Sequence, residues 1–173
     1  AQKLVYDRLD DPYFSYSGPT SMGKSFVMRM FIKKQIMDST RANFALLVPT
    51  KALINEVTSS IINDLKEMLA ENNYRLVTSA GALALKEDHK FILVLTPERL
   101  LYLLISNPEL NIDHLFIDEA HKISTKGSRS AFYYKVVDML SRREKKPNII
   151  FASPNIPNPE IYLKLIPDAD VQF

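Results

Sequence analysis

The feature that most constrains the fold of this chain is one eight-residue segment, Gly18-Pro19-Thr20-Ser21-Met22-Gly23-Lys24-Ser25. It matches the pattern G-x-x-x-x-G-K-[S/T], a glycine-rich loop that joins a strand to a helix. The residues before it, Tyr13 to Ser17, predict a strand, and those after it, Lys24 to Met37, predict a helix. The loop therefore predicts an α/β fold in which a helix N-terminus faces a bound anion.

Each part of this loop has a task in binding a nucleoside triphosphate. The glycines let the backbone curl so that its N–H groups point at phosphate oxygens. Lys24 would neutralise the β- and γ-phosphates, and the Ser25 hydroxyl would bind Mg²⁺. The alternative is a chance glycine-rich turn. The chain has only four glycines and two of them, Gly18 and Gly23, fall in this loop, which favours the binding site.

Short apolar runs alternate with helical patterns along the whole chain. The expected strands are 13–17, 44–48, 74–78, 91–95, 114–118 and 148–152, and the expected helices are 24–37, 52–69, 97–106, 128–143 and 160–165. The apolar helix faces are expected at Phe26, Val27, Met30 and Phe31, at Leu53, Val57, Ile61 and Leu65, and at Tyr133, Val136, Val137 and Leu140. This alternation predicts a mainly parallel sheet with helices on both faces, and one domain over residues 1–173.

A second polar feature follows a buried strand about ninety residues after the loop. Leu115-Phe116-Ile117 leads into Asp118 and Glu119, which we expect at the carboxyl edge of the sheet, where open α/β sheets bind ligands. Asp118 would hold Mg²⁺ through its water shell, and Glu119 would orient and deprotonate an attacking water. The alternative is a solvated helix cap. The complete phosphate loop makes that alternative the weaker one.

The charge balance excludes a strongly basic protein. The 22 Lys and Arg residues against 20 Asp and Glu give a net charge of +2, so a nucleic-acid role would need a local basic groove. Lys33-Lys34 and the cluster 142–146 lie near predicted helix C-termini, where the helix dipole favours cations. The second cluster could also contact nucleic acid or a partner domain. The basic loop with Lys126, Gly127 and Arg129 is a weaker candidate.

The compartment is indicated only by absences. The chain has no cysteine, no apolar run near the roughly 18 residues that a membrane span needs, and no signal peptide at its first residues. We therefore expect no membrane partner and a cytoplasmic location, or a nuclear one in a eukaryote.

With these motifs in place, the chain resembles a known family. Asp118-Glu119-Ala120-His121 is similar to the DEAH form of the second motif of superfamily 2 helicases, and the phosphate loop is similar to their first motif in its Ski2-like version. The resemblance implies the first of two RecA-like domains, a three-layer α/β/α fold. It also implies ATP and Mg²⁺ as cofactors, with RNA or DNA and the second RecA-like domain of the same chain as partners.

Two further segments resemble the family's strand-binding motifs. Pro49-Thr50-Lys51 is similar to motif Ia, and Thr96-Pro97-Glu98-Arg99 is similar to motif Ib. The resemblance implies that Pro49, Thr50, Lys51, Thr96, Pro97 and Arg99 grip the sugar-phosphate backbone of one strand. Ser79-Ala80-Gly81 lies where the family has a small loop of the same kind, although turn chemistry is the better interpretation there. Gln2 lies where the family reads adenine; the alternative is a Gln on a helix surface.

The chain also departs from the family pattern. Its third motif reads Ser153-Pro154 where the family has Ser-Ala-Thr, and the proline removes a backbone donor. This puts in doubt the implied roles of Ser153 and His121 in coupling hydrolysis to strand separation. The chain ends before motifs IV to VI, so we expect a piece of a longer protein. Without an arginine finger, worth about 10³–10⁵ in rate, it should bind ATP weakly and hydrolyse it slowly.

Three functions remain open at this point. The leading one is the ATP-binding domain of a nucleic-acid-dependent ATPase or helicase that unwinds or remodels RNA or DNA. The second is a helicase-like translocase that moves along duplex without unwinding it. The third is a regulatory module switched by nucleotide, and the intact Lys24, Ser25, Asp118 and Glu119 argue against it.

Overall fold

The computed structural model describes residues 13–18, 21–79, 89–118 and 130–154, and for 13–25, 130 and 152–154 it describes the backbone alone. The helix expected at 160–165 lies outside these ranges. So do several predicted site residues, namely Gln2, Pro19, Thr20, Glu119 and His121.

Six strands and four helices alternate through the described residues. The strands are β1 (Tyr13–Gly18), β2 (Phe44–Leu47), β3 (Tyr74–Val77), β4 (Lys90–Leu95), β5 (His114–Ile117) and β6 (Asn148–Pro154). The helices are α2 (Ser21–Met37), α3 (Lys51–Glu71), α4 (Pro97–Ser106) and α5 (Ser130–Ser141). The strands form one sheet in the order β1-β6-β5-β2-β4-β3, and every pair of neighbours is parallel.

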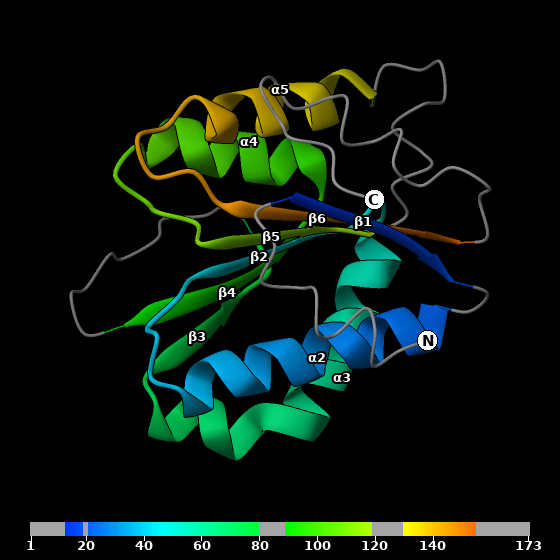
Figure 1. Ribbon diagram of the computed structural model, residues 1–173, viewed down its shortest axis with the longest axis vertical. Helices are drawn as coiled ribbons and strands as arrows, with labels where there is room; N and C mark the ends of the chain where they lie inside the picture. Colours follow the sequence, from blue (N-terminus) through cyan, green and yellow to red (C-terminus); the bar gives the residue numbers. More distant parts are fainter. Residues whose placement is uncertain (1–12, 19–20, 80–88, 119–129, 155–173) are drawn as a thin grey trace.

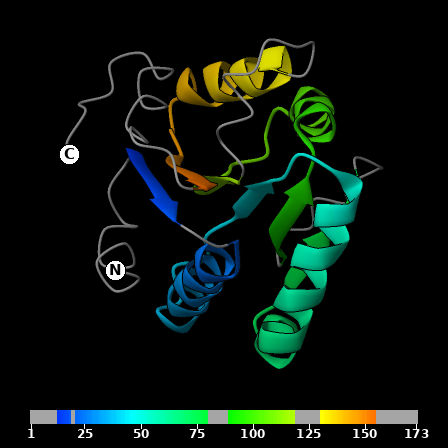
Figure 2. The same cartoon turned by 90° about the vertical axis from the view of Figure 1, so that its right-hand side faces the viewer.

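The helices cover the two faces of this sheet in pairs. Helices α2 and α3 pack on one face and α4 and α5 on the other, so the sheet is the middle layer of three (Figure 1). The same sandwich is visible from the side in Figure 2. The expected three-layer α/β/α fold with a parallel sheet is therefore confirmed.

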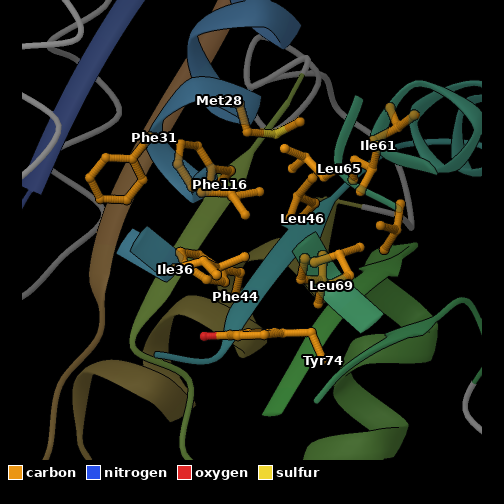
Figure 3. Close-up of a cluster of buried hydrophobic side chains, with 14 of the residues drawn as sticks. Met28, Phe31, Ile36, Phe44, Leu46, Ile61, Leu65, Leu69, Tyr74 and Phe116 are labelled. Atoms are coloured by element: carbon orange, nitrogen blue, oxygen red, sulfur yellow. The ribbon is translucent and has the colours of Figure 1, made fainter. Parts of the chain in front are cut away.

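Successive residues of each strand enter opposite cores, because strand side chains alternate between faces. In β2, Phe44 and Leu46 face α2 and α3, whereas Ala45 and Leu47 face α4 and α5. Figure 3 shows the first of these cores, in which Phe44, Leu46 and Tyr74 meet side chains from both helices. A slip of one residue in register would exchange the two cores, so the alternation fixes the pairing of the strands.

The helix faces follow the expectations except at three residues, Phe26, Met30 and Leu53. All four residues expected to be buried in α5 are buried: Tyr133, Val136, Val137 and Leu140. In α2, Val27 and Phe31 are buried as expected, but Phe26 is 46% exposed and Met30 only half-buried, so their expected placement in the core is wrong. Ile32 and Ile36 complete this face instead.

In helix α3, three of the four residues expected on the apolar face, Val57, Ile61 and Leu65, are buried. Its buried stripe is Ile54, Val57, Ile61, Leu65 and Leu69, and Leu53 is only half-buried. The stripe starts one residue later than expected and keeps to the sheet.

The element bounds differ from expectation in a few places. Helix α2 begins at Ser21 rather than Lys24, within the phosphate-loop motif. Helix α5 ends at Ser141, so Arg142 and Arg143 lie after it. Strand β6 continues to Pro154 instead of stopping at residue 152. Beyond Phe151, β6 pairs with β1 alone because β5 has ended, and a proline is tolerated where one side of a strand is unpaired.

The described helices were also compared with the length and hydropathy of a membrane span. None of them is long and apolar enough to cross a bilayer.

Candidate nucleotide and nucleic-acid site

The predicted site residues that the structure describes lie at the carboxyl edge of the sheet. All six strands run in the same direction, so the segments that follow Gly18, Leu47, Val77, Leu95, Ile117 and Pro154 emerge at one edge. Ligands of open α/β sheets bind outside this edge. The two principal motifs, about ninety residues apart in the sequence, therefore share one side of the molecule.

The phosphate-loop motif links β1 to α2 as its chemistry requires. Gly18 is the last residue of β1, and Ser21, Met22, Gly23, Lys24 and Ser25 form the start of α2. The first turn of this helix contains no acidic residue. Acidic residues commonly neutralise the partial positive charge of a helix N-terminus, so this one is left to an external anion such as phosphate.

Asp118 follows β5 directly and is fixed by the backbone. Its N–H donates to the Leu47 carbonyl oxygen at 2.9 Å, which extends the contact with β2 by one residue beyond the paired strands. The residue is half-buried. Only β6 separates β5 from β1, so Asp118 and the start of the phosphate loop lie two strands apart on the same edge.

The cofactor suggested by these motifs fits the chemistry of the residues. The Ser25 hydroxyl and the Asp118 carboxylate are oxygen groups, which Mg²⁺ prefers, and Mg²⁺ usually takes only one or two carboxylates alongside substrate phosphates. The helix N-terminus without acidic residues suits the phosphates themselves. The residue types and their common edge are thus compatible with a magnesium–nucleotide complex.

The loop after β2 is a helix cap with exposed polar groups. Pro49 is buried, whereas Thr50 and Lys51 are exposed. Thr50 is the N-cap of α3, and its hydroxyl accepts a hydrogen bond from the Leu53 N–H at 3.2 Å. Since Thr50 has this capping role whether or not a strand binds, Lys51 is the clearer candidate for a phosphate contact.

The loop after β4 is less open than the sequence suggests. Thr96 is only 7% exposed and Pro97 is also buried at the first position of α4. Arg99 is half-buried, and its Nη1 donates to the Thr78 carbonyl oxygen at 3.0 Å. The three residues lie at the expected edge, and their contacts with nucleic acid stay a prediction.

The third motif lies between the two principal ones. Strand β6 places Ser153 beside Ser17 and Pro154 beside Gly18 in the parallel register with β1. The motif therefore runs alongside the strand that enters the phosphate loop. The roles predicted for Ser153 and His121 stay predictions.

The basic clusters lie at the opposite, amino edge of the sheet. Lys34 is in the last turn of α2, as the helix-dipole interpretation expects. Arg142 pairs with Asp138 at 2.9 Å and Lys145 with Asp113 at 2.9 Å, while Arg143 donates to the Leu110 carbonyl oxygen and burial lowers its pKa. These contacts favour a structural role for the cluster. The loop with Lys126, Gly127 and Arg129 lies outside the described residues.

A surface hollow of about 700 Å³ lies away from the site. It is formed by the second half of α3 and Lys33 of α2, with charged side chains of both signs such as Asp64, Lys66 and Glu67. These segments lead toward the amino edge, so the hollow is separate from the motifs described above.

The fold and the site together define a class of protein, the P-loop nucleotide-binding domains built on a parallel sheet. Within that class, the chain belongs to the DEAD/DEAH box helicase family, whose model matches residues 2–161. This confirms the resemblance inferred from the motifs.

Individual relatives extend this result. The chain is 30% identical over 142 residues to the ATP-dependent RNA helicase MAK5 of Candida glabrata, covering 73% of this chain and 19% of the relative. It is 24% identical over 188 residues to an uncharacterized ATP-dependent helicase of Methanocaldococcus jannaschii, covering 99% of this chain and 27% of that protein. The chain thus spans about a fifth to a quarter of the length of these relatives.

Solved structures share the fold. The crystal structure of the DUF1998 helicase MrfA superposes with a TM-score of 0.73 over 95% of this chain and 28% of MrfA, at 20% sequence identity. A second structure, of MrfA bound to DNA, has the same TM-score at 19% identity. At this level of identity, the similarity establishes the fold and not the substrate.

Proposed function

We propose that this chain is the ATP-binding domain of a nucleic-acid-dependent ATPase that acts as a helicase. The observation that carries the proposal is the common edge of the sheet shared by the phosphate-loop motif at Gly18 and the acidic motif at Asp118. Family membership supports the same function, since several of the matching relatives are named ATP-dependent RNA helicases.

In the proposed reaction, each residue has a limited task. The start of α2 and Lys24 would hold the triphosphate, and Ser25 and Asp118 would hold Mg²⁺, which neutralises charge on the phosphates. Glu119 would orient and deprotonate the attacking water. Phosphoryl transfer depends mainly on positioning and charge neutralisation, which these groups supply. Gln2 would read the adenine.

The proposed partner is one strand of nucleic acid. Thr50 and Lys51 lie at the same edge as the nucleotide motifs, where hydroxyl and cationic groups can bind phosphates without reading bases. The relatives include RNA helicases and a helicase crystallised with DNA, so both nucleic acids are candidates. A second RecA-like domain would supply the arginine finger, and a cytoplasmic or nuclear location would fit these partners.

The direct test is Glu119→Gln in the full-length protein. The variant should still bind ATP, because the amide keeps the size of the side chain, but it should lose turnover by about 10²–10⁴-fold because the base is gone. Turnover would be followed by phosphate release with and without single-stranded RNA or DNA. Unchanged turnover would remove Glu119 from its assigned role.

A strand-displacement assay separates the leading proposal from its alternative. A helicase should release a labelled strand from a partial duplex in the presence of ATP. A translocase that moves along duplex would hydrolyse ATP on duplex and displace a bound protein without releasing the strand. The altered third motif at Ser153-Pro154 is the feature that favours examining this alternative.

A further inference from the structure

The loops at the carboxyl edge are joined in a row by hydrogen bonds beyond the paired strands. The Asp118 N–H donates to the Leu47 carbonyl at 2.9 Å, which joins the end of β5 to that of β2. The Val48 N–H donates to the Leu95 carbonyl at 3.0 Å, which joins β2 to β4. Both of these links are made by backbone groups.

The last link of the row, from β4 to β3, is different. Strand β3 ends at Val77, which is paired with Leu93, whereas β4 continues for two more residues to Leu95. The chain therefore leaves the sheet at Thr78, before its neighbour ends. The Thr78 carbonyl is bound instead by a side chain, since Arg99 Nη1 donates to it at 3.0 Å.

The position of Arg99 makes this bond noteworthy. Arg99 is the third residue of α4, in the first turn, where the helix dipole disfavours a cation. A cation retained there needs a compensating interaction, and a hydrogen bond from a charged donor to a carbonyl is among the stronger ones. The guanidinium is half-buried, so it lies against the loop and not free in solvent.

We infer that Arg99 is a positioning residue, which holds Thr78 and Ser79, where the chain leaves β3, against the start of α4 at one end of the strand-binding edge. The residue contributes to strand binding through this segment, and not by bonding a phosphate itself. The inference deepens the proposed function, because it assigns the means by which one end of the binding edge is kept in place.

The first measurement needs no nucleic acid and so stands even if the proposed function fails. Hydrogen–deuterium exchange of the free full-length protein would be followed in peptides that cover residues 74–79. Arg99→Ala should speed exchange of the strand amides at the end of β3, because the bond fixes the chain where it leaves that strand, and Arg99→Lys, which keeps one donor, should restore part of the protection. Unchanged exchange in Arg99→Ala would overturn the inference.

The second measurement separates positioning from phosphate contact. Each phosphate contact on a single strand contributes about 0.7 to the slope of log affinity against log salt. Arg99→Ala should weaken binding of a labelled oligonucleotide by roughly five- to twentyfold, consistent with the loss of a charged hydrogen bond, while leaving the slope unchanged. Lys51→Ala, an exposed cation on the neighbouring loop, should lower the slope.

Arg142→Ala is the matched control for removing one arginine charge. Arg142 lies at the amino edge, paired with Asp138, so its loss should change neither exchange in residues 74–79 nor the salt slope. A slope in Arg99→Ala that falls by about 0.7, as in Lys51→Ala, with exchange unchanged, would show direct phosphate contact and overturn the inference.

Discussion

The two edges of the sheet use polar side chains in opposite ways. At the amino edge, polar groups bind other parts of the fold: Asn43 Nδ2 donates to the Asn111 carbonyl at 2.8 Å, and Asn43 Oδ1 accepts from the Phe91 N–H at 2.8 Å. At the carboxyl edge, the links between strands are mainly backbone bonds, and Thr50 and Lys51 stay exposed.

This difference teaches where function and stability reside. Hydrogen bonds at the amino edge join segments that are 48 to 70 residues apart in the sequence, through Asn43, Phe91 and Asp113. The polar groups of these residues are therefore already bonded within the fold. The links between strands at the carboxyl edge do not use Lys51, which stays exposed and is left for a ligand. Substitutions at the two edges should therefore affect different properties.

The largest expected effect is on turnover, from Lys24→Ala at the carboxyl edge. Loss of the charge facing the β- and γ-phosphates should lower kcat/KM for ATP by about 10²–10³-fold, in the range of one lost electrostatic contact in an active site. Urea unfolding of the same variant checks that the loss of turnover is not a loss of folded protein.

Lys33→Ala is the control, since it removes the same charge from the exposed later part of the same helix. It should leave turnover as it is. Equal losses of turnover in Lys24→Ala and Lys33→Ala would contradict the proposed difference between the two edges. Turnover would then depend on the overall charge and not on the position of the lysine at the carboxyl edge.

The next effect is on stability, from Asn43→Ala at the amino edge. Asn43 is 6% exposed, and its removal leaves the buried Phe91 N–H and the Asn111 carbonyl without their partner. Unfolding free energy should fall by about 2–3 kcal/mol, as expected for buried groups left unsatisfied. Turnover per folded molecule should be close to that of the wild type; a loss under about 0.5 kcal/mol would contradict the structural role.

A smaller effect, dependent on pH, is expected at Tyr74. Burial raises its pKa to about 12, with Asp113 also raising it and Arg41 opposing the shift. The hydroxyl donates to the Ala42 carbonyl at 2.7 Å. The folded state thus favours the neutral phenol, so this stabilisation is complete below pH 10 and is lost as pH rises from about 10 through 12.

Tyr74→Phe isolates this contribution. The variant should lose about 1 kcal/mol of stability at pH 8 because one hydrogen bond is gone. The difference from the wild type should then shrink between pH 10 and 12, measured by urea unfolding at each pH. A difference that stays constant through this range would show that the phenol does not titrate as described.

The smallest effect is expected from Lys145→Ala. The Lys145 side chain is 67% exposed, and such ion pairs contribute about 0–1 kcal/mol, less at high salt. Asp113 would still accept from the Asn43 N–H at 2.7 Å. A loss above about 1 kcal/mol, or any change in oligonucleotide binding, would show that this cluster does more than pair within the fold.

Local sequence patterns were enough to predict the helices and strands, and most of the placements at the carboxyl edge of the sheet. The apolar runs at 91–95 and 114–117 predicted buried strands, and the placement of Asp118 at the carboxyl edge followed from the strand before it. The burial of a residue was predicted wrongly where it depends on neighbours that are distant in the sequence. Phe26 is as apolar as Phe31, but only the second lies over the sheet.

The polar contacts were beyond sequence-based inference for the same reason. Asn43 follows no motif, and its partners lie 48 to 70 residues away, so only the folded strand order brings them together. The Arg99–Thr78 bond depends on β3 ending two residues before β4, which residue type alone does not show. The continuation of β6 to Pro154 depended likewise on where β5 stops.

The position of β1 at one side of the sheet has a consequence for local unfolding. Among the described strands, β1 and β3 are the two outermost, and β1, which is paired only with β6, carries the entry to the phosphate loop. Strands with one neighbour are the first to open locally, at a free energy below that of global unfolding. A bound nucleotide should stabilise the paired state of β1. It should therefore raise the resistance of β1 to proteolysis before it alters the resistance of the interior strands.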